Sequence, residues 1–226
     1  MPKINSVICE LNPMHNGHKY IFDNAHTSND SDEIKIAVMS GNFTQRCTPA
    51  VFDKYTRAYV AILCGADIVV ELPFPWCASG VEDFAMGGVR VASGMGSDSL
   101  FFGSESADLD LLKKVAEIKE SDEYKNICET IDSTNRSVGC AVNFDSVVRE
   151  FGIEQSLGAN DKLASEYIRF GGKMGIKSFC PIKRIADIKS ATNIRNGVFD
   201  GSISEYKNDI PHHPEGSRRA GSRRED

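Results

Sequence analysis

Two histidines lie three residues apart around a glycine in the segment ELNPMHNGHKY, residues 10–20 of a chain with only five histidines. Residues at this spacing share one side of a helical turn, so the rings of His15 and His18 can reach the same phosphate group. Imidazole donates a hydrogen bond or carries a charge near neutral pH, and either suits negative charge on phosphoryl oxygens. The pattern predicts a catalytic pair acting on nucleotide phosphates. The alternative is two exposed histidines at a helix start.

The neighbours of this pair favour the first interpretation. Pro13 stiffens the chain before the histidines, and Gly17 allows the backbone to come close to a ligand. A helix that begins here presents unpaired N–H groups and the positive end of its dipole to an anion.

The elements that must position the pair are readable from hydropathy. Short apolar runs rich in Val, Ile and Phe predict strands within residues 4–11, 33–43, 67–74, 97–104 and 176–185. Polar patterns between them predict helices at about 16–28, 52–65, 80–95 and 107–120. This alternation indicates an α/β, Rossmann-like parallel sheet with helices on both faces. Ligands bind such sheets at the carboxyl ends of the strands, where the histidine pair falls.

The remaining segments complete one predicted domain, residues 1–200. Residues from about 121 to 175 form a helical insert before the last strand, which we expect to pack over the open edge of the sheet. Residues 201–226 are polar and basic, and we expect a disordered tail there.

Two further groups of residues fall at the same predicted edge. The loop and helix start after the second strand contain candidates for the acceptor or acetate side of a site: Asn42, Gln45, Arg46 and Lys54. An ordinary loop beside a solvated helix face is the alternative.

The later strands and helix starts contribute Gly103, Asn160, Arg184, Ser190, Thr192 and Arg195. Hydroxyls and an arginine at the last helix start form a second phosphate cradle, and two such cradles suit a triphosphate. For Asn160 a helix-capping role is the first expectation and nucleotide contact the second, whereas Gly103 is equally interpretable as an ordinary strand-ending glycine.

Composition restricts the class of protein. The 226 residues are 41% hydrophobic and carry a net charge of −6, which disfavours a surface built wholly for nucleic acid. Seven cysteines, an odd number without a C-x-x-C pair, predict neither a zinc site nor a disulfide framework. With no leader peptide and no long apolar run, we expect a reduced, soluble, cytoplasmic protein that does not enter membranes.

Several blocks taken in order resemble one family. NPMHNGH, AVMSGNFTQR, DIVVELPF, DSLFFGSE, GANDKL and SATNIR, spread over roughly residues 5–200, are similar to the tRNA(Met) cytidine acetate ligases, within the HUP-type nucleotidyltransferase-like superfamily. The resemblance implies that ATP and acetate form acetyl-adenylate, and that the acetyl group then passes to the wobble cytidine of elongator tRNA(Met). It implies ATP as substrate, with Mg²⁺ as its usual companion.

The resemblance also implies which residues contact ATP. They are Gly103, Asn160 and Arg184, with the continuous stretch Val7, Ile8, Cys9, Glu10, Leu11, Asn12, Pro13, Met14, His15, Asn16, Gly17, His18, Lys19 and Tyr20. The chain departs from the family at Cys47 and Thr48, where Gly-Glu is usual, and at Leu11 and Met14, where aromatics are usual. Family members continue past the S-x-T-x-x-R segment, so we expect this chain to lack their C-terminal region. Another adenylyl- or cytidylyltransferase, or a nucleotide-binding protein without catalysis, remains an alternative.

Overall fold

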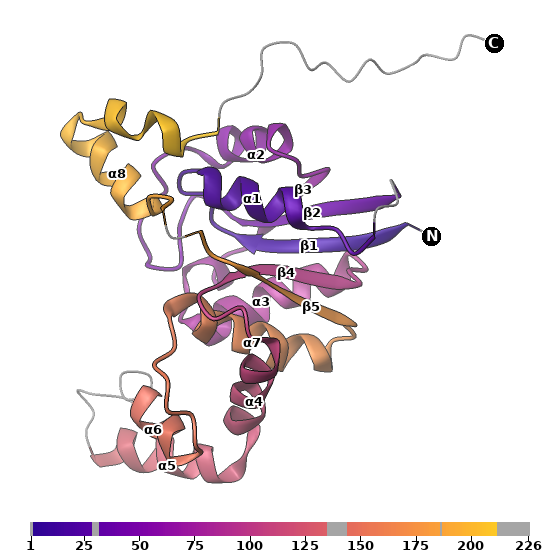
Figure 1. Cartoon of the computed structure of the whole chain (residues 1–226), viewed down its shortest axis with the longest axis vertical. Coiled ribbons are helices and arrows are strands. Elements are labelled where there is room, and N and C mark those ends of the chain that lie inside the picture. The colour runs from indigo at the N-terminus through magenta and orange to yellow at the C-terminus, as the bar shows by residue number, and fades with distance from the viewer. Residues whose placement is uncertain (1, 29–31, 135–143, 186, 212–226) are drawn as a thin grey trace.

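A five-stranded parallel sheet forms the centre of the protein. A computed structural model describes residues 2–28, 32–134, 144–185 and 187–211 (Figure 1). The strands are β1 (Lys3–Cys9), β2 (Glu33–Ser40), β3 (Ile68–Leu72), β4 (Ser99–Ser104) and β5 (Ser178–Lys183). Their order across the sheet is β3-β2-β1-β4-β5, and all neighbouring strands are parallel. The predicted α/β fold is confirmed, and the order reverses between β1 and β4, where such sheets bind ligands.

Helices cover both faces of this sheet. They are α1 (Asn16–Asn24), α2 (Lys54–Leu63), α3 (Val81–Gly94), α4 (Leu109–Glu120), α5 (Asp122–Thr134), α6 (Phe144–Glu150), α7 (Ala159–Lys173) and α8 (Ala191–Asp200), with short 3-10 turns η1 (Trp76–Ala78) and η2 (Ile203–Asp209). Alternate strand residues enter separate apolar clusters: Ile8 packs with α3, α4 and α7, whereas Val7 packs with α1 and α2. This two-sided burial explains why the strand sequences are continuously apolar.

The segment predicted as one helical insert divides into two parts. Helix α7 packs against α3, α4 and β4, so it covers a face of the sheet as the crossover helix before β5. Helices α5 and α6 lie away from the sheet (Figure 1), and Phe144 and Val148 form a separate cluster with Val115. The expectation that residues 121–175 pack together over the sheet edge is therefore wrong for α7. Its apolar face is long enough to join the main core, which helical periodicity by itself does not reveal.

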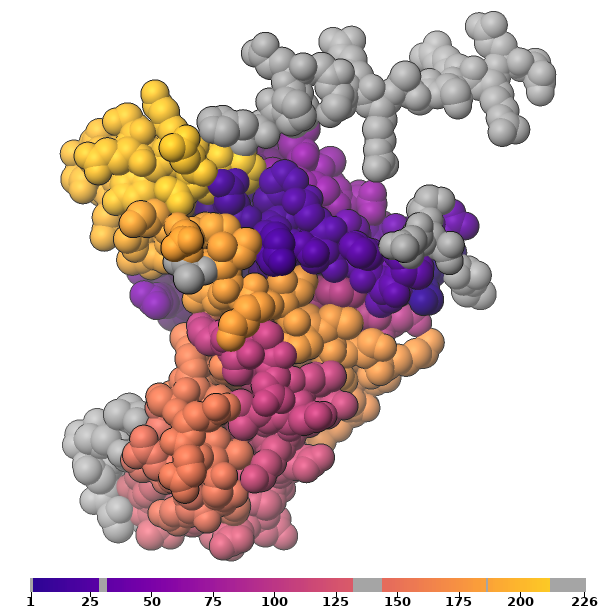
Figure 2. All heavy atoms as spheres, in the orientation of Figure 1, coloured from indigo at the N-terminus to yellow at the C-terminus, as the bar shows by residue number. Residues whose placement is uncertain are grey.

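Part of the segment predicted as a disordered tail has regular structure. Residues 203–209 form η2, and Tyr206 fills the space beside Gly197, where an added Cβ would lie 2.5 Å from the tyrosine ring. The Asn16 side chain donates to the carbonyl of Asn208 at 2.6 Å, so η2 reaches the start of α1. In the space-filling view the yellow C-terminal turn stands beside the indigo N-terminal segment (Figure 2). Residues 212–226, the rest of the predicted tail, lie outside the described residues.

The cysteines differ from expectation in one respect. Cys128 in α5 is disulfide-bonded, whereas the cysteine count and spacing predicted a reduced protein without a disulfide framework. A single bond does not need the paired spacing on which that prediction relied. Cys9, Cys47, Cys64 and Cys77 are free, as is Cys180. Within the described ranges, no helix has the length and apolar character needed to cross a membrane.

A buried arginine ties together the loops at the carboxyl ends of β1 and β2. The guanidinium of Arg57, in α2, donates to the carbonyls of Glu10 at 2.5 Å, Phe52 at 3.0 Å and Gly41. The Arg57 side chain is 2% exposed. One side chain thus donates to three loop carbonyls, one in a buried contact and two in partly buried contacts.

Replacing this arginine should therefore be costly. We expect Arg57→Met to lower the free energy of unfolding by about 3 kcal/mol, because the substitution leaves buried carbonyls without donors. Urea unfolding measures the change. The matched control is Arg90→Met, at an exposed position of α3, for which we expect a change within about 0.5 kcal/mol. Similar small losses for both variants would show that the three carbonyls find other donors.

Candidate active site

The loop between β1 and α1 is held on both sides by other segments. Leu11 is fully buried and adopts a left-handed backbone conformation, with φ 49°. The side-chain oxygen of Asn12 accepts from the N–H of Val51 at 2.8 Å, and its carbonyl accepts from Arg195 at 2.6 Å. The loop before the histidines is thus fixed by the loop between β2 and α2 and by α8. Arg195 of α8 is 183 residues from Asn12 along the chain.

The two histidines lie together, as predicted. His15 caps α1, and its Nδ1 accepts from the N–H of Gly17 at 3.0 Å. The ring centroids of His15 and His18 are 3.9 Å apart. Gly17 is required by this arrangement, since an added Cβ would lie 2.7 Å from Cε1 of His15. Because Nδ1 of His15 accepts a hydrogen bond, the neutral ring carries its proton on Nε2 and can donate it to a ligand.

Both imidazoles are neutral at neutral pH in this state. Burial, followed by the positive charge of Arg184, lowers the pKa of His15 to about 4. Burial, followed by the charges of His15 and Arg184, holds the pKa of His18 well below 6.5. The Nδ1 atom of His18 is buried and has no hydrogen-bond partner. A buried polar atom without a partner is costly, so this ring is prepared to meet a polar group of a ligand.

The ends of β4 and β5 and the start of α7 bring Gly103, Arg184 and Asn160 to one place. Gly103 pairs with Ile182 in the sheet, and a Cβ added to Gly103 would be 3.8 Å from Cγ of Arg184. Glu105, which the sequence did not single out, joins the other two: its carboxylate accepts from Asn160 Nδ2 at 2.6 Å and from Arg184 Nη1 at 3.1 Å. The sequence signal that could have identified Glu105 is its position directly after β4, close to Gly103.

The start of α8 supplies the second predicted cradle. Ser190 caps α8 by accepting from the N–H of Asn193 at 3.3 Å. Arg195 donates to the hydroxyl of Thr192 at 2.9 Å and to the Asn12 carbonyl. Burial is the largest influence on Arg195 and lowers its pKa, and the positive charge of Arg46 acts in the same direction. The starts of α1 and α8 are therefore connected through the loop between β1 and α1. Part of the Arg195 guanidinium is already hydrogen-bonded to protein groups.

The second loop, between β2 and α2, and the first residue of α2 carry the four residues predicted for an acceptor. Gln45 donates its backbone N–H to Glu10 at 2.6 Å, and its buried Nε2 atom has no partner. Arg46 is exposed. The other two have structural partners: Asn42 accepts from the N–H of Lys54 at 3.2 Å, and Lys54 forms an ion pair with Glu71 at 2.6 Å. Gln45 and Arg46 are therefore better placed to meet a ligand than Asn42 and Lys54.

The remaining predicted contacts are largely structural in their side chains. Those of Val7, Ile8, Cys9, Leu11 and Met14 are buried in the apolar core. Burial raises the pKa of the Cys9 thiol to about 12, so this cysteine is not a nucleophile at neutral pH. Lys19 forms an ion pair with Asp23 at 2.7 Å, and Tyr20 is exposed. From β1, then, the backbone rather than the side chains is available to a ligand.

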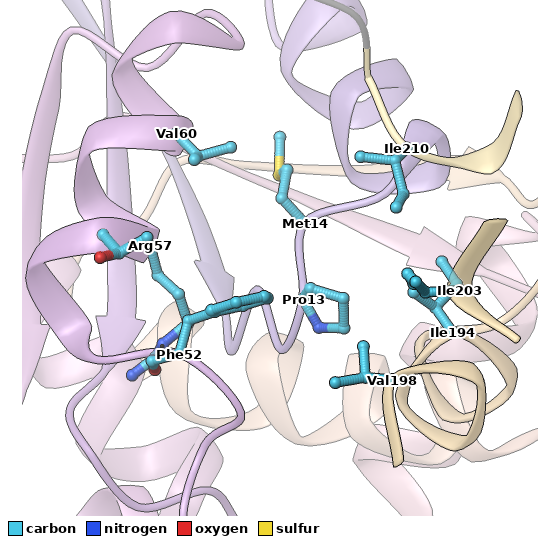
Figure 3. Close-up of a pocket in the computed structure, with 10 residues that line it drawn as sticks. Pro13, Met14, Phe52, Arg57, Val60, Ile194, Val198, Ile203 and Ile210 are labelled. Carbon is cyan, nitrogen blue, oxygen red and sulfur yellow. Dashed lines mark hydrogen bonds between the residues drawn. The ribbon is translucent and has the colours of Figure 1, made fainter. Parts of the chain in front are cut away.

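An apolar cavity lies beside the loop between β1 and α1 (Figure 3). Its volume is about 230 Å³. The lining residues are Pro13, Met14, Phe52, Thr56, Arg57, Val60, Ile194, Val198, Ile203 and Ile210. A nucleotide needs several polar partners, which this mostly apolar lining does not offer, so the cavity suits an apolar group rather than a nucleotide.

Comparisons with known proteins identify relatives of this chain. A family profile described as HIGH Nucleotidyl Transferase matches residues 2–216. The tRNA(Met) cytidine acetate ligase of Pediococcus pentosaceus is 32% identical over 216 residues, covering 91% of this chain and 55% of that protein. The enzyme of the same name from Caldanaerobacter subterraneus subsp. tengcongensis is 33% identical over 223 residues, covering 91% of this chain and 55% of its own. The chain thus spans about half the length of these curated relatives.

A solved structure agrees with the sequence matches. The crystal structure of Thermotoga maritima TmcAL bound with alpha-thio ATP superposes with a TM-score of 0.80 at 36% identity, covering 92% of this chain and 53% of that one. The apo form of the same protein gives a TM-score of 0.78 at 33% identity, covering 93% and 55%.

The depressed pKa of His15 makes stability depend on pH. The unfolded chain binds a proton to this ring below about pH 6.5, whereas the folded protein does so only near pH 4. The free energy of unfolding should therefore fall as the pH falls through this window. We expect His15→Asn, which retains a side chain able to cap α1, to show a shallower decline. Urea unfolding between about pH 7 and about pH 4 measures both slopes.

The exposed residue His26 provides the control. His26→Asn should keep the wild-type dependence on pH, because its ring is not buried. An equally steep decline for His15→Asn and the wild type would contradict the neutral, buried state of His15.

Proposed function

The chain belongs to the HIGH nucleotidyltransferase family, among the tRNA(Met) cytidine acetate ligases, and from this premise we propose that it activates acetate with ATP and supports acetyl transfer to the wobble cytidine of elongator tRNA(Met), forming N4-acetylcytidine. In the first step an acetate oxygen attacks the α-phosphorus and pyrophosphate leaves. In the second, the exocyclic amine attacks the acetyl carbonyl, loses a proton and releases AMP.

One observation carries the first step of this proposal. Two neutral imidazoles lie 3.9 Å apart at a helix N-terminus, and one of them has a buried nitrogen without a partner. Neutral rings donate hydrogen bonds to phosphoryl oxygens, and their pKa values rise when negative charge develops beside them. His15 and His18 would thus stabilise the charge on the α-phosphate as pyrophosphate departs. ATP bound to the related Thermotoga maritima protein, as its alpha-thio analogue, supports the choice of nucleotide.

Other residues would bind the rest of the nucleotide. Arg184 and Asn160, with Gly103 beside them, form one side of the ATP site, and the α8 start with Ser190, Thr192 and Arg195 forms the other. The described residues contain no cluster of three His, Cys, Asp or Glu side chains able to hold a metal ion by themselves. Mg²⁺ commonly binds through phosphates with few protein ligands, so it fits this site as a companion of ATP that neutralises phosphate charge.

Acetate and the cytidine amine would approach from the second loop. Gln45 offers an unpartnered buried amide nitrogen, and Arg46 offers an exposed positive charge. Asn42 and Lys54 would position this loop through their contact with each other and the ion pair of Lys54 with Glu71.

The role of the histidines is testable by substitution. We expect His18→Ala to lower the rate of acetate-dependent pyrophosphate exchange by about 10²- to 10³-fold, with only a modest change in ATP affinity, because its hydrogen bond strengthens in the transition state. His26→Ala, at an exposed position outside the site, is the matched control and should exchange at the wild-type rate. Near-normal turnover in His18→Ala would remove His18 from the chemistry.

The exchange assay also distinguishes the alternatives. Exchange that needs an acceptor other than acetate would indicate a different nucleotidyltransferase of this fold. ATP binding without any exchange would indicate a nucleotide-binding protein without catalysis.

The two half-reactions should differ in this chain. A net charge of −6 opposes RNA binding, which depends on neutralising several phosphates with Lys and Arg. We expect residues 1–226 to form acetyl-adenylate but to acetylate tRNA poorly, with the yield falling further as salt is raised. Purified protein incubated with ATP, labelled acetate and elongator tRNA(Met) reports pyrophosphate and acetylated tRNA separately. Efficient acetylation would show that the tRNA surface lies within these residues.

A further inference from the structure

The carboxylate of Glu105 collects N–H donors from two elements of the site. Oε1 accepts from Asn160 Nδ2 at 2.6 Å and from Arg184 Nη1 at 3.1 Å, and Oε2 accepts from the N–H of Asp161 at 3.0 Å. Asn160 and Asp161 belong to the first turn of α7, and Arg184 directly follows β5. One side chain thus joins the two residues proposed to bind ATP from separate parts of the chain.

A second carboxylate, that of Asp161, accepts hydrogen bonds from the segment that carries Glu105. Asp161 is 2% exposed and accepts from the backbone N–H groups of Glu105 at 3.0 Å and Ser106 at 3.0 Å, and from the hydroxyl of Ser104. The loop after β4 therefore binds the start of α7, and the start of α7 binds the loop. Lys183 donates to the Glu105 carbonyl at 2.5 Å, which also attaches this loop to β5.

The backbone around Glu105 leaves room for this carboxylate. A Cβ added to Gly158, the residue before α7, would lie 2.3 Å from Cδ of Glu105. Glu105 is partly buried, and burial alone would raise its pKa, yet the bonds from Asn160, Asp161 and Arg184 lower it. It is therefore held as a carboxylate, an acceptor for N–H groups and a negative partner for Arg184.

We propose that Glu105 is a positioning residue that orients Asn160 and Arg184 toward ATP, an inference that rests on the proposed function. A guanidinium has five N–H donors in a rigid fork. The Arg184 contact with Glu105 uses one nitrogen and leaves the others for the nucleotide. In the same way, the Asn160 amide gives one N–H to Glu105 and keeps its oxygen and second N–H. Fixing these long side chains before binding removes part of the entropy that ordering them would cost.

The competing explanation is that Glu105 acts only as a helix cap for α7. Asp108 provides the matched control, because its side chain caps α4 by accepting from the N–H of Leu111 at 3.0 Å and forms part of neither ATP-binding element. Glu105→Gln and Asp108→Ala should each lower the midpoint of thermal unfolding, the first by removing a charged acceptor and the second by removing a helix cap. Only the substitution of Glu105 should change nucleotide binding.

The test measures ATP affinity by calorimetry and the KM for ATP in pyrophosphate exchange. We expect Glu105→Gln to weaken ATP binding about 10-fold and to raise KM with little change in turnover, whereas Asp108→Ala changes either value less than about two-fold. In a background of Arg184→Ala, Glu105→Gln should weaken binding clearly less than in the wild type, because the two side chains act together. Glu105→Asp, which keeps the charge on a shorter side chain, should give an intermediate loss and serves if Glu105→Gln does not fold.

Several outcomes would overturn this role. Unchanged ATP affinity in Glu105→Gln, with only a lower unfolding midpoint, would leave Glu105 as a cap. Full additivity with Arg184→Ala would show that it does not act through Arg184. If the wild type bound ATP normally, these results would contradict the role of Glu105 alone. If the wild type did not bind ATP, the proposed function itself would fail and the inference with it.

Discussion

The geometry of the candidate site depends on the satisfaction of loop carbonyls by Arg57. Loops at the carboxyl ends of β1 and β2 turn away from the sheet, so their backbone carbonyls no longer have hydrogen-bond donors on a neighbouring strand. Where these carbonyls are shielded from water, another protein group has to supply the donors. The Arg57 guanidinium donates to one carbonyl after each strand and to a third just before α2. With those loops fixed, Asn12 is held between Val51 and Arg195, and His15 begins α1 in a set position.

Charge is distributed unevenly around this framework. The chain has a net charge of −6, yet its candidate site contains Arg46, Arg184 and Arg195 as well as two neutral histidines. Burial, followed by the positive charge of Arg184, lowers the pKa of His15 before a ligand arrives, and the negative charge of a bound polyphosphate would act in the opposite direction to Arg184. The site is therefore arranged to gain electrostatic stabilisation from an anion, although the whole surface is not suited to one.

The opposite side of the site depends on a pair of carboxylates rather than an arginine. Glu105 and Asp161 each accept N–H groups from the segment that carries the other. This exchange satisfies the N-terminal N–H groups of α7 and those of the loop after β4 at the same time. It also explains a glycine at position 158, since a side chain there would occupy the space of the Glu105 carboxylate.

Local patterns in the sequence determined the sheet, its first four helices and the histidine pair. Strands buried on both faces require continuous apolar runs, and the approach of His15 to His18 follows from spacing within one helical turn. Tertiary structure alone decided the contacts between distant segments. Arg57 has the sequence character of an ordinary helix residue, and Glu105 meets Asn160 from 55 residues away. The packing of α7 on α3 and the ordered turn of η2 were likewise missed. Hydropathy period and spacing describe a segment's own face, whereas these partners are selected only when separate segments are brought together by the folded sheet.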